Sequence, residues 1–287
     1  MKDLRQVLSQ NTKLELSSSE EYDEKAGLEW LCEVENKAEG NLNEYDGYDC
    51  RACKNRGFIW VCRPAIYSKG YQMITQTCRC AKIRRSIRSL QKSGLQTVVQ
   101  KYKFDTYNAA EEWQKHVIGK AKAFAEDGFQ NHWFYYGGQS GCGKTHICTA
   151  VAIALLKKGY EVKYMVWIDD AKALKAKANS EDYAEMIEQY KKVDVLYIDD
   201  LFKTGRKEGQ TKQQPTAADI NLAIEILNAR LIANKITIIS SETLITDMLD
   251  LDEATAGRVI EKCGDDYCIC VSPDKTKNYR LKGLKML

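Results

Sequence analysis

The pattern of apolar and polar positions changes at about residue 130. Beyond that point, short apolar runs typical of strands alternate with longer stretches in which apolar residues recur at helical spacing. Five runs are predicted as strands: 132–137, 161–167, 194–200, 235–241 and 267–272. Such alternation is typical of a mostly parallel sheet covered by helices, so we predict an α/β fold for this part of the chain.

The part before this change is predicted to contain short helices. Residues 10–45 hold Ser-rich helix-start signals followed by apolar residues at helical spacing. Two more helices are expected, a basic one within 81–95 and another within 103–128. We therefore predict a small helix-containing N-terminal domain over 1–95 and a larger α/β domain over 96–287.

Charge is distributed unevenly along the first hundred residues. Residues 1–49 contain 13 acidic and 5 basic side chains, whereas residues 51–103 contain 13 Lys or Arg and no Asp or Glu. The basic run is a candidate surface for a nucleic acid or an acidic partner. The alternatives are a solvated face and an internal counterweight to the acidic run.

Neither a signal peptide nor a membrane span is expected. The longest apolar segment, 149–156, stops at Lys157 after a length suited to a buried helix. Eleven cysteines in a long and highly charged chain favour buried thiols or metal ligands over a disulfide framework. We therefore expect a cytoplasmic protein that does not contact a membrane.

A phosphate-binding motif follows the first of the predicted strands. Gly138, Gly143, Lys144 and Thr145 match G-x-x-x-x-G-K-[ST], between an apolar strand and an amphipathic helix. Backbone N–H groups of such a loop bind phosphate oxygens, the lysine reaches the β- and γ-phosphates, and the threonine can hold Mg²⁺. Aromatic residues upstream, in 102–108, could pack on a base or in the core. The residues expected around the nucleotide are Gly138, Gln139, Ser140, Gly141, Cys142, Gly143, Lys144, Thr145 and His146.

Two acidic residues end the strand predicted over 194–200. Asp199 is expected to bind Mg²⁺ through water, together with Thr145. Asp200 is expected to orient or deprotonate the attacking water. Two carboxylates at a buried strand end would repel each other without a cation. The pair therefore supports a nucleoside triphosphatase in which Lys144 and Asp200 are catalytic.

Four cysteines form two close pairs. Cys50 and Cys53 are followed, after 24 intervening residues, by Cys78 and Cys80. Two such pairs can direct four thiolates at one Zn²⁺, which would stabilise a small module with little core of its own. The second pair has one intervening residue instead of two, so Cys62 is an alternative ligand, and buried free thiols are the alternative for the whole set. The other cysteines are expected to be buried thiols without metal: Cys32, Cys142, Cys148, Cys263, Cys268 and Cys270.

Four motifs in order resemble those of the AAA+ replicative helicase loaders of the DnaC/DnaI type, which occur in bacteria and phages. They are GGQSGCGKTH, VDVLYIDDLF, NARLIANKITIISSE and DEATAGRVIEKC, and the likeness covers about 95–287. The same core is similar to that of the transposition helper ATPases of the IstB type. The resemblance implies an AAA+ P-loop domain that binds and hydrolyses ATP with Mg²⁺ and associates with copies of itself.

The resemblance also implies roles for residues that match the family motifs. Ser241 and Glu242 occupy the first sensor position beside the γ-phosphate. Arg258 is the arginine finger presented to a neighbouring subunit, and Arg280 is the second sensor arginine, because developing phosphate charge needs fixed donors. Arg230 matches a further arginine of the family, to which no role is assigned. The family usually has Asn at the position of Glu242, where a carboxylate needs a cation partner, so Ser241 is the expected sensor and the hydrolysis rate stays open.

A zinc-bearing module ahead of the ATPase is similar to the helicase-docking part of the Gram-positive and phage loaders. The implied partners are a hexameric replicative helicase of the DnaB type and single-stranded DNA. We therefore predict a loader that uses ATP to help place the helicase on single-stranded DNA when replication begins. The alternatives are an IstB-type transposition helper acting on duplex DNA and a weakly hydrolysing, nucleotide-gated adaptor.

Overall fold

The computed structural model describes residues 23–67, 69–90, 101–130, 132–204 and 214–281. The chain divides into two compact units, one up to Cys78 and one from Arg79 onward. The predicted helical residues before Asp23, and the end of the basic helix beyond Leu90, lie outside the described residues.

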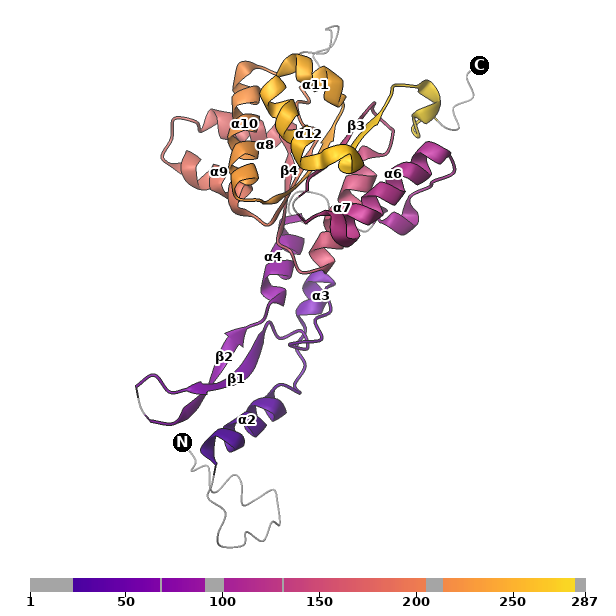
Figure 1. The fold of residues 1–287 in the computed structure, drawn as a ribbon. Helices are drawn as coiled ribbons and strands as arrows, with labels where there is room; N and C mark the ends of the chain where they lie inside the picture. The colour runs from indigo at the N-terminus through magenta and orange to yellow at the C-terminus, as the bar shows by residue number, and fades with distance from the viewer. Residues whose placement is uncertain (1–22, 68, 91–100, 131, 205–213, 282–287) are drawn as a thin grey trace, which may run out of the picture. The chain divides into compact units, whose positions relative to one another are not determined.

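The first unit consists of helices and a two-stranded hairpin. Its elements are α2 (Glu24–Glu35), α3 (Leu42–Asp46), β1 (Phe58–Pro64) and β2 (Tyr71–Thr77). The strands pair antiparallel, and α2 packs on both of them (Figure 1). At the end of α2, the Asn36 side chain donates to the Trp60 carbonyl at 2.8 Å and accepts from the Trp60 N–H at 2.9 Å. The sequence predicted the helices, but the hairpin that supports them was not predicted.

The second unit is built on a parallel sheet. Its strands are β3 (Phe134–Gly138), β4 (Val162–Val166), β5 (Val195–Asp199), β6 (Ile236–Ser241) and β7 (Cys268–Val271). They lie in the order β4-β5-β6-β3-β7, and every neighbouring pair is parallel. All five predicted strands are confirmed. The carboxyl ends of β3, β5 and β6 therefore lie close together at one edge, where open α/β sheets bind ligands.

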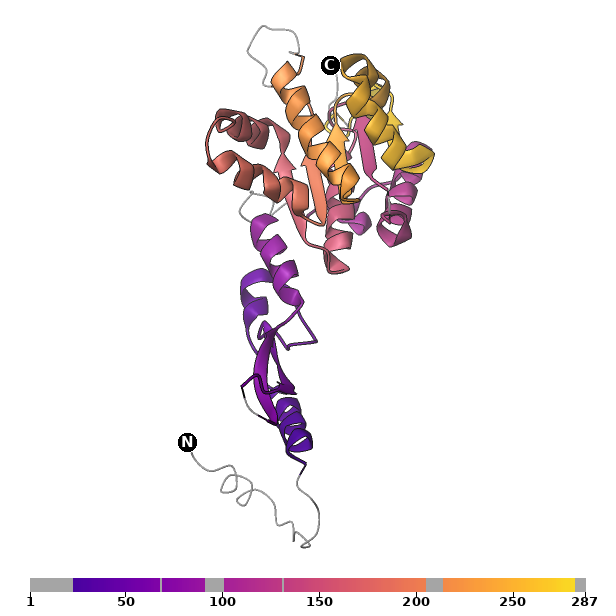
Figure 2. The same ribbon diagram turned by 60° about the vertical axis from the view of Figure 1, so that its left-hand side comes forward.

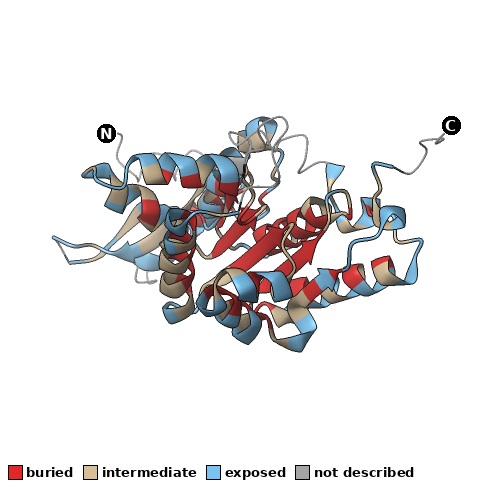
Figure 3. Cartoon of the chain, turned by 90° about the horizontal axis from the view of Figure 1, so that it is seen from above, coloured by how far each residue is buried: buried red, intermediate tan, exposed pale blue. Residues whose placement is uncertain are grey.

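Helices cover both faces of this sheet (Figures 1 and 2). The described helices of this unit are α4 (Cys80–Leu90), η2 (Phe104–Thr106), α6 (Glu112–Ala123), η3 (Phe124–Gly128), α7 (Lys144–Lys157), α8 (Trp167–Ala176), α9 (Asp182–Lys192), α10 (Ala217–Ile232), α11 (Ile245–Leu251), α12 (Glu253–Tyr267) and η4 (Lys275–Lys277). Helix α7 packs on β3, β4, β5 and β6, whereas α12 packs on β3 and β7. Figure 3 shows the buried strands between helices whose outer surfaces are exposed. None of the described helices is long and apolar enough to span a bilayer.

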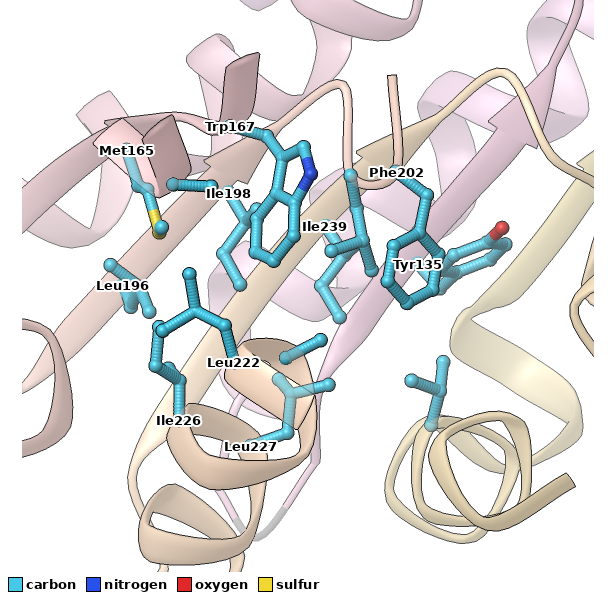
Figure 4. Close-up of a cluster of buried hydrophobic side chains, with 14 of the residues drawn as sticks. Tyr135, Met165, Trp167, Leu196, Ile198, Phe202, Leu222, Ile226, Leu227 and Ile239 are labelled. Atoms are coloured by element: carbon cyan, nitrogen blue, oxygen red, sulfur yellow. The ribbon is translucent and has the colours of Figure 1, made fainter. Parts of the chain in front are cut away.

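A hydrophobic cluster joins the sheet to α10 (Figure 4). Tyr135, Ile198 and Ile239 come from the neighbouring strands β3, β5 and β6, and Leu222 and Ile226 come from α10. Each buried aliphatic side chain of this kind contributes roughly 1.5–3 kcal/mol. The cluster therefore holds in place the strands whose ends carry the phosphate loop and the acidic pair.

Helix α4 belongs to the second unit. It packs on β4, the edge strand, and Ser86 Oγ accepts a hydrogen bond of 2.9 Å from the N–H of Val162. Arg84 on the same helix is buried. The division between the units therefore falls after Cys78, before the boundary near residue 95 that the sequence suggested.

Candidate functional site

The phosphate loop leaves β3 and ends where α7 begins. Gly141 has φ +81° and Gly143 has φ +92°, conformations that residues with a side chain rarely adopt. A Cβ at Gly141 would also lie 1.9 Å from Oδ1 of Asn278. The loop therefore needs glycine at these two positions, and α7 offers its free N-terminal N–H groups to an anion.

Lys144 and Thr145 lie at the first turn of α7. Lys144 is buried, and its Nζ donates to the carbonyls of Gly138 at 2.9 Å and Gln139 at 3.0 Å. The hydroxyl of Thr145 donates to Oδ1 of Asp199 at 3.4 Å. A hydroxyl and a carboxylate at this separation are hard oxygen donors that fit Mg²⁺.

Asp199, at the end of β5, is buried, and its carboxylate accepts hydrogen bonds from three further hydroxyl groups. Tyr164 donates to its Oδ2 at 2.5 Å, Tyr197 donates to its Oδ1 at 2.9 Å, and Ser240 also donates to Oδ1. Burial raises the pKa of Tyr164, and the charge of Asp199 raises it further. The carboxylate is therefore oriented by neutral donors.

Asp200 follows with φ +58°, a left-handed conformation. Its N–H donates to Ser240 Oγ at 2.9 Å, which fixes the backbone against β6. Its Oδ2 lies 2.5 Å from Nζ of Lys203, and the same Nζ lies 3.7 Å from Oε1 of Glu242. The cation partner that Glu242 requires is thus Lys203, a residue that the sequence reasoning did not single out.

A cavity of about 300 Å³ opens between the phosphate loop and the acidic strand ends. Its charged and hydroxyl lining comprises Thr106, Ser140, Lys144, Thr145, Asp200, Lys203, Glu242 and Arg280. Its aromatic lining comprises Tyr102, Tyr107, His146 and Tyr279. One end thus suits phosphates with Mg²⁺, and the aromatic rings suit the flat face of a base.

The aromatic wall is held by contacts across the chain. Tyr102 stacks on His146 with ring centroids 4.8 Å apart, and the Nε2 of His146 is 2.8 Å from the carbonyl of Lys103. Burial lowers the pKa of His146, so the ring is neutral at neutral pH. The N–H of Tyr279 donates to the carbonyl of Gly141 at 2.9 Å. The segments before β3 and after β7 therefore contact the phosphate loop and the first turn of α7.

The residues predicted from the resemblance lie in different settings. Arg280 reaches the loop, since its Nη1 donates to Ser140 Oγ at 3.2 Å. Arg258, on α12, donates to the carbonyl of Ala254 in its own helix and is not among the described residues that line the cavity.

Ser241 is fully buried at the end of β6, and its hydroxyl donates to the carbonyl of Leu201 at 2.8 Å. It is not among the lining residues, whereas Glu242 is. Side chains of a strand alternate between its faces, so Ser240 and Glu242 share the side of Asp200. This alternation is the signal that could have distinguished the two positions in the sequence.

Arg230 has a structural setting. It is fully buried on α10, and it donates to the carbonyl of Tyr190 at 2.8 Å, to that of Val193 at 3.0 Å and to Thr237 Oγ1 at 3.0 Å. The guanidinium group thus satisfies carbonyls at the end of α9, which a helix leaves without partners.

The two cysteine pairs converge. One ligand atom from each of Cys50, Cys53, Cys78 and Cys80 lies within 4.8 Å of the others, and all four residues are buried. The sulfur atoms of Cys50 and Cys78 are 3.8 Å apart. Four sulfurs bound tetrahedrally to zinc at about 2.3 Å would be separated by about 3.8 Å. The Cys₄ cluster is therefore compatible with zinc.

Further contacts support the cluster as a metal site. The N–H of Gly57 donates to Sγ of Cys53 at 3.2 Å, a contact that favours the charged thiolate. Cys62, the alternative ligand, lies on β1 opposite Met73 and is not part of the cluster. The prediction of buried thiols elsewhere is confirmed for Cys32, Cys142, Cys148 and Cys263. It is wrong for Cys270, which is exposed on β7, and Cys268 on the same strand is only half-buried.

Comparison with known proteins gives the following likenesses. The family profile of the IstB-like ATP binding protein matches residues 72–251. The uncharacterized protein YqaM of Bacillus subtilis is 30% identical over 238 residues, which cover 77% of this chain and 71% of YqaM. The replicative helicase loader DnaC of Escherichia coli K12 is 27% identical over 117 residues, 40% of this chain and 48% of DnaC. The match thus spans about half the length of DnaC.

A crystal structure of the DnaC helicase loader superposes with a TM-score of 0.50. It covers 61% of this chain and 98% of the DnaC chain, at 19% identity. This likeness shows the fold, an α/β P-loop domain of the AAA+ class with five parallel strands.

Proposed function

This chain belongs to the family of IstB-like ATP-binding proteins, and we propose that it is a cytoplasmic, ATP-dependent loader of a replicative helicase. In this proposal it binds a hexameric helicase of the DnaB type and helps to place it on single-stranded DNA when replication begins. The observation that carries the helicase assignment is the likeness to DnaC in sequence. The cavity supports the requirement for ATP.

The geometry of the charged residues supports hydrolysis of ATP in this proposal. Lys144 and the loop N–H groups bind the β- and γ-phosphates, and Thr145 with Asp199 would hold Mg²⁺, which neutralises phosphate charge when bound. Asp200 accepts a proton from water as the water oxygen bonds to the γ-phosphorus. The bond from this phosphorus to the bridging oxygen breaks, and ADP leaves with the electron pair.

Two arginines complete the proposed site. Arg280 donates to Ser140 of the phosphate loop, so it is placed to contact phosphates of its own chain. Arg258 lies on another helix, α12, and we assign it to the nucleotide of a neighbouring copy. The ATPase domains would then hydrolyse ATP only when they associate.

The first unit is proposed to hold the helicase. Zinc bound to the four cysteines would cross-link the chain on either side of the β1–β2 hairpin. This cross-link would stabilise the hairpin, whose strands are at most partly buried. The basic run 51–103 is a candidate path for single-stranded DNA, because it contains 13 Lys or Arg and no Asp or Glu.

A transposition helper is the second candidate, because the matching family profile is that of the IstB-like proteins. It would bind a transposase and duplex DNA in place of a helicase and single strands. A nucleotide-gated adaptor with weak turnover is the third, and the carboxylate of Glu242 in the cavity favours it.

The test is a loading assay with purified protein and candidate hexameric replicative helicases. We expect a stable complex in size-exclusion chromatography and ATP-dependent transfer of helicase to a closed circle of single-stranded DNA. Lys144→Ala should retain the complex and lose transfer. Binding of a transposase and duplex DNA, without any helicase complex, would instead support the transposition helper.

A further inference from the structure

Lys203 is a second lysine in the phosphate cavity, beside Lys144. It lies three residues beyond Asp200, and no phosphate-loop motif predicts it. Its Nζ is 2.5 Å from Asp200 and 3.7 Å from Glu242, and all three residues line the cavity together with Lys144.

The two carboxylates make this lysine necessary for an anionic ligand. Asp200 and Glu242 would each repel a phosphate group that enters the cavity. Burial on its own lowers the pKa of Lys203, but the hydrogen bond to Asp200 and the charges of both carboxylates outweigh it and raise the pKa. Lys203 therefore carries a full positive charge at neutral pH.

Lys203 has the donors to serve more than one partner. An ammonium group carries three N–H donors on a flexible stem, and its side chain here is partly exposed, at 39%. Phosphate oxygens form charge-assisted hydrogen bonds with such a group, and a terminal phosphate carries more charge than one carboxylate. A bound triphosphate can therefore compete with Asp200 for Lys203.

We propose that Lys203 is a third phosphate-binding cation of this cavity, beside Lys144 and Arg280, and that it passes from Asp200 to the terminal phosphate of a bound nucleoside triphosphate. This inference rests on the proposed ATP-binding function. Glu242 keeps the ammonium group in the cavity after the exchange. Asp200, released from its ion pair, then has both oxygens available to accept the proton of water.

The test compares affinities for a non-hydrolysable ATP analogue and for ADP, measured by calorimetry with Mg²⁺. Lys203→Met should weaken binding of the ATP analogue about tenfold and change ADP binding less than about twofold, because only the triphosphate has the terminal group. Lys203→Arg keeps the cation and should retain the preference. Lys115→Met is the matched control, since Lys115 pairs with Glu112 at the same spacing outside the cavity lining.

The outcomes separate this inference from the function on which it rests. If Lys203→Met leaves the ratio of the two affinities unchanged, the role of Lys203 is overturned but the proposed ATP site is not. Unimpaired binding of both nucleotides by Lys144→Ala would overturn the proposed ATP site, and the inference with it. Retained ADP affinity in Lys203→Met also shows that the variant is folded.

Discussion

The hydroxyl group of Tyr164 donates a hydrogen bond of 2.5 Å to Oδ2 of Asp199. It reaches from β4 to the end of the neighbouring strand β5. Because burial keeps the phenol protonated, the carboxylate is held by a neutral donor and its charge stays available to a cation. Tyr164 is therefore a positioning residue for the metal that Asp199 and Thr145 are proposed to share.

We predict that Tyr164→Phe raises the Mg²⁺ concentration needed for half-maximal ATPase activity by roughly tenfold. Removing the hydrogen-bond partner of a metal-binding side chain typically lowers metal affinity by about that factor. Nucleotide binding without Mg²⁺ should not change. Titrating Mg²⁺ at saturating ATP measures the shift. Tyr183→Phe is the control, because its hydroxyl donates to Glu225 at 2.6 Å, away from the cavity. Equal shifts in both variants would contradict the assignment.

Lys144 and Asp200 should differ in which step they affect. Lys144→Ala should abolish detectable ATP binding, because it removes a contact to the ground-state phosphates. Asp200→Asn should bind ATP within a few-fold of the wild type and hydrolyse it roughly a hundredfold or more slowly, since it removes the proton acceptor. Binding by calorimetry and single-turnover hydrolysis separate the two. Equal loss of binding in both variants would argue against these roles.

Arg258→Ala should bind ATP normally and lose most of its ATPase activity. If the arginine acts on a neighbouring copy, mixing this variant with Lys144→Ala should restore part of the activity, because each interface then needs only one intact site and one intact arginine. A double variant lacking both residues should restore nothing when mixed with Arg258→Ala. Without recovery under conditions where subunits exchange, the assignment in trans is wrong.

The elements that could be predicted are those whose causes are local in the sequence. A parallel strand covered on both faces is apolar along most of its length, so the apolar runs within 194–200 and 235–241 were recognisable as strands. The phosphate loop was recognisable because its two glycines, Lys144 and Thr145 lie within eight residues. The structure adds a conformational reason for Gly143, whose φ is positive, and for Gly141, which has a positive φ although the motif does not specify it.

The remaining parts depend on contacts between distant segments. Tyr279 lies 138 positions after Gly141 and meets it only because β7 runs beside β3. The ion pair of Lys203 with Glu242 likewise depends on β5 and β6 being neighbours. Composition and motif spacing do not indicate which strands are neighbours in the sheet, so neither contact could be predicted from one sequence.

The four-cysteine cluster gives the last prediction. Protein purified without chelators should contain about one zinc ion per chain. Cys53→Ser should lose the ion, because it removes one of four converging thiolates, whereas Cys62→Ser should retain it, because Cys62 lies outside the cluster.

Loss of zinc should unfold the region around the hairpin β1–β2 and abolish helicase binding, since the binding energy of a structural metal is folding energy. ATP binding should persist, because its cavity is lined by residues from Tyr102 onward. Metal analysis, protease sensitivity, helicase capture and calorimetric ATP binding measure these four outcomes, and a Cys53→Ser variant that keeps its zinc or still captures helicase would overturn the zinc-dependent docking unit.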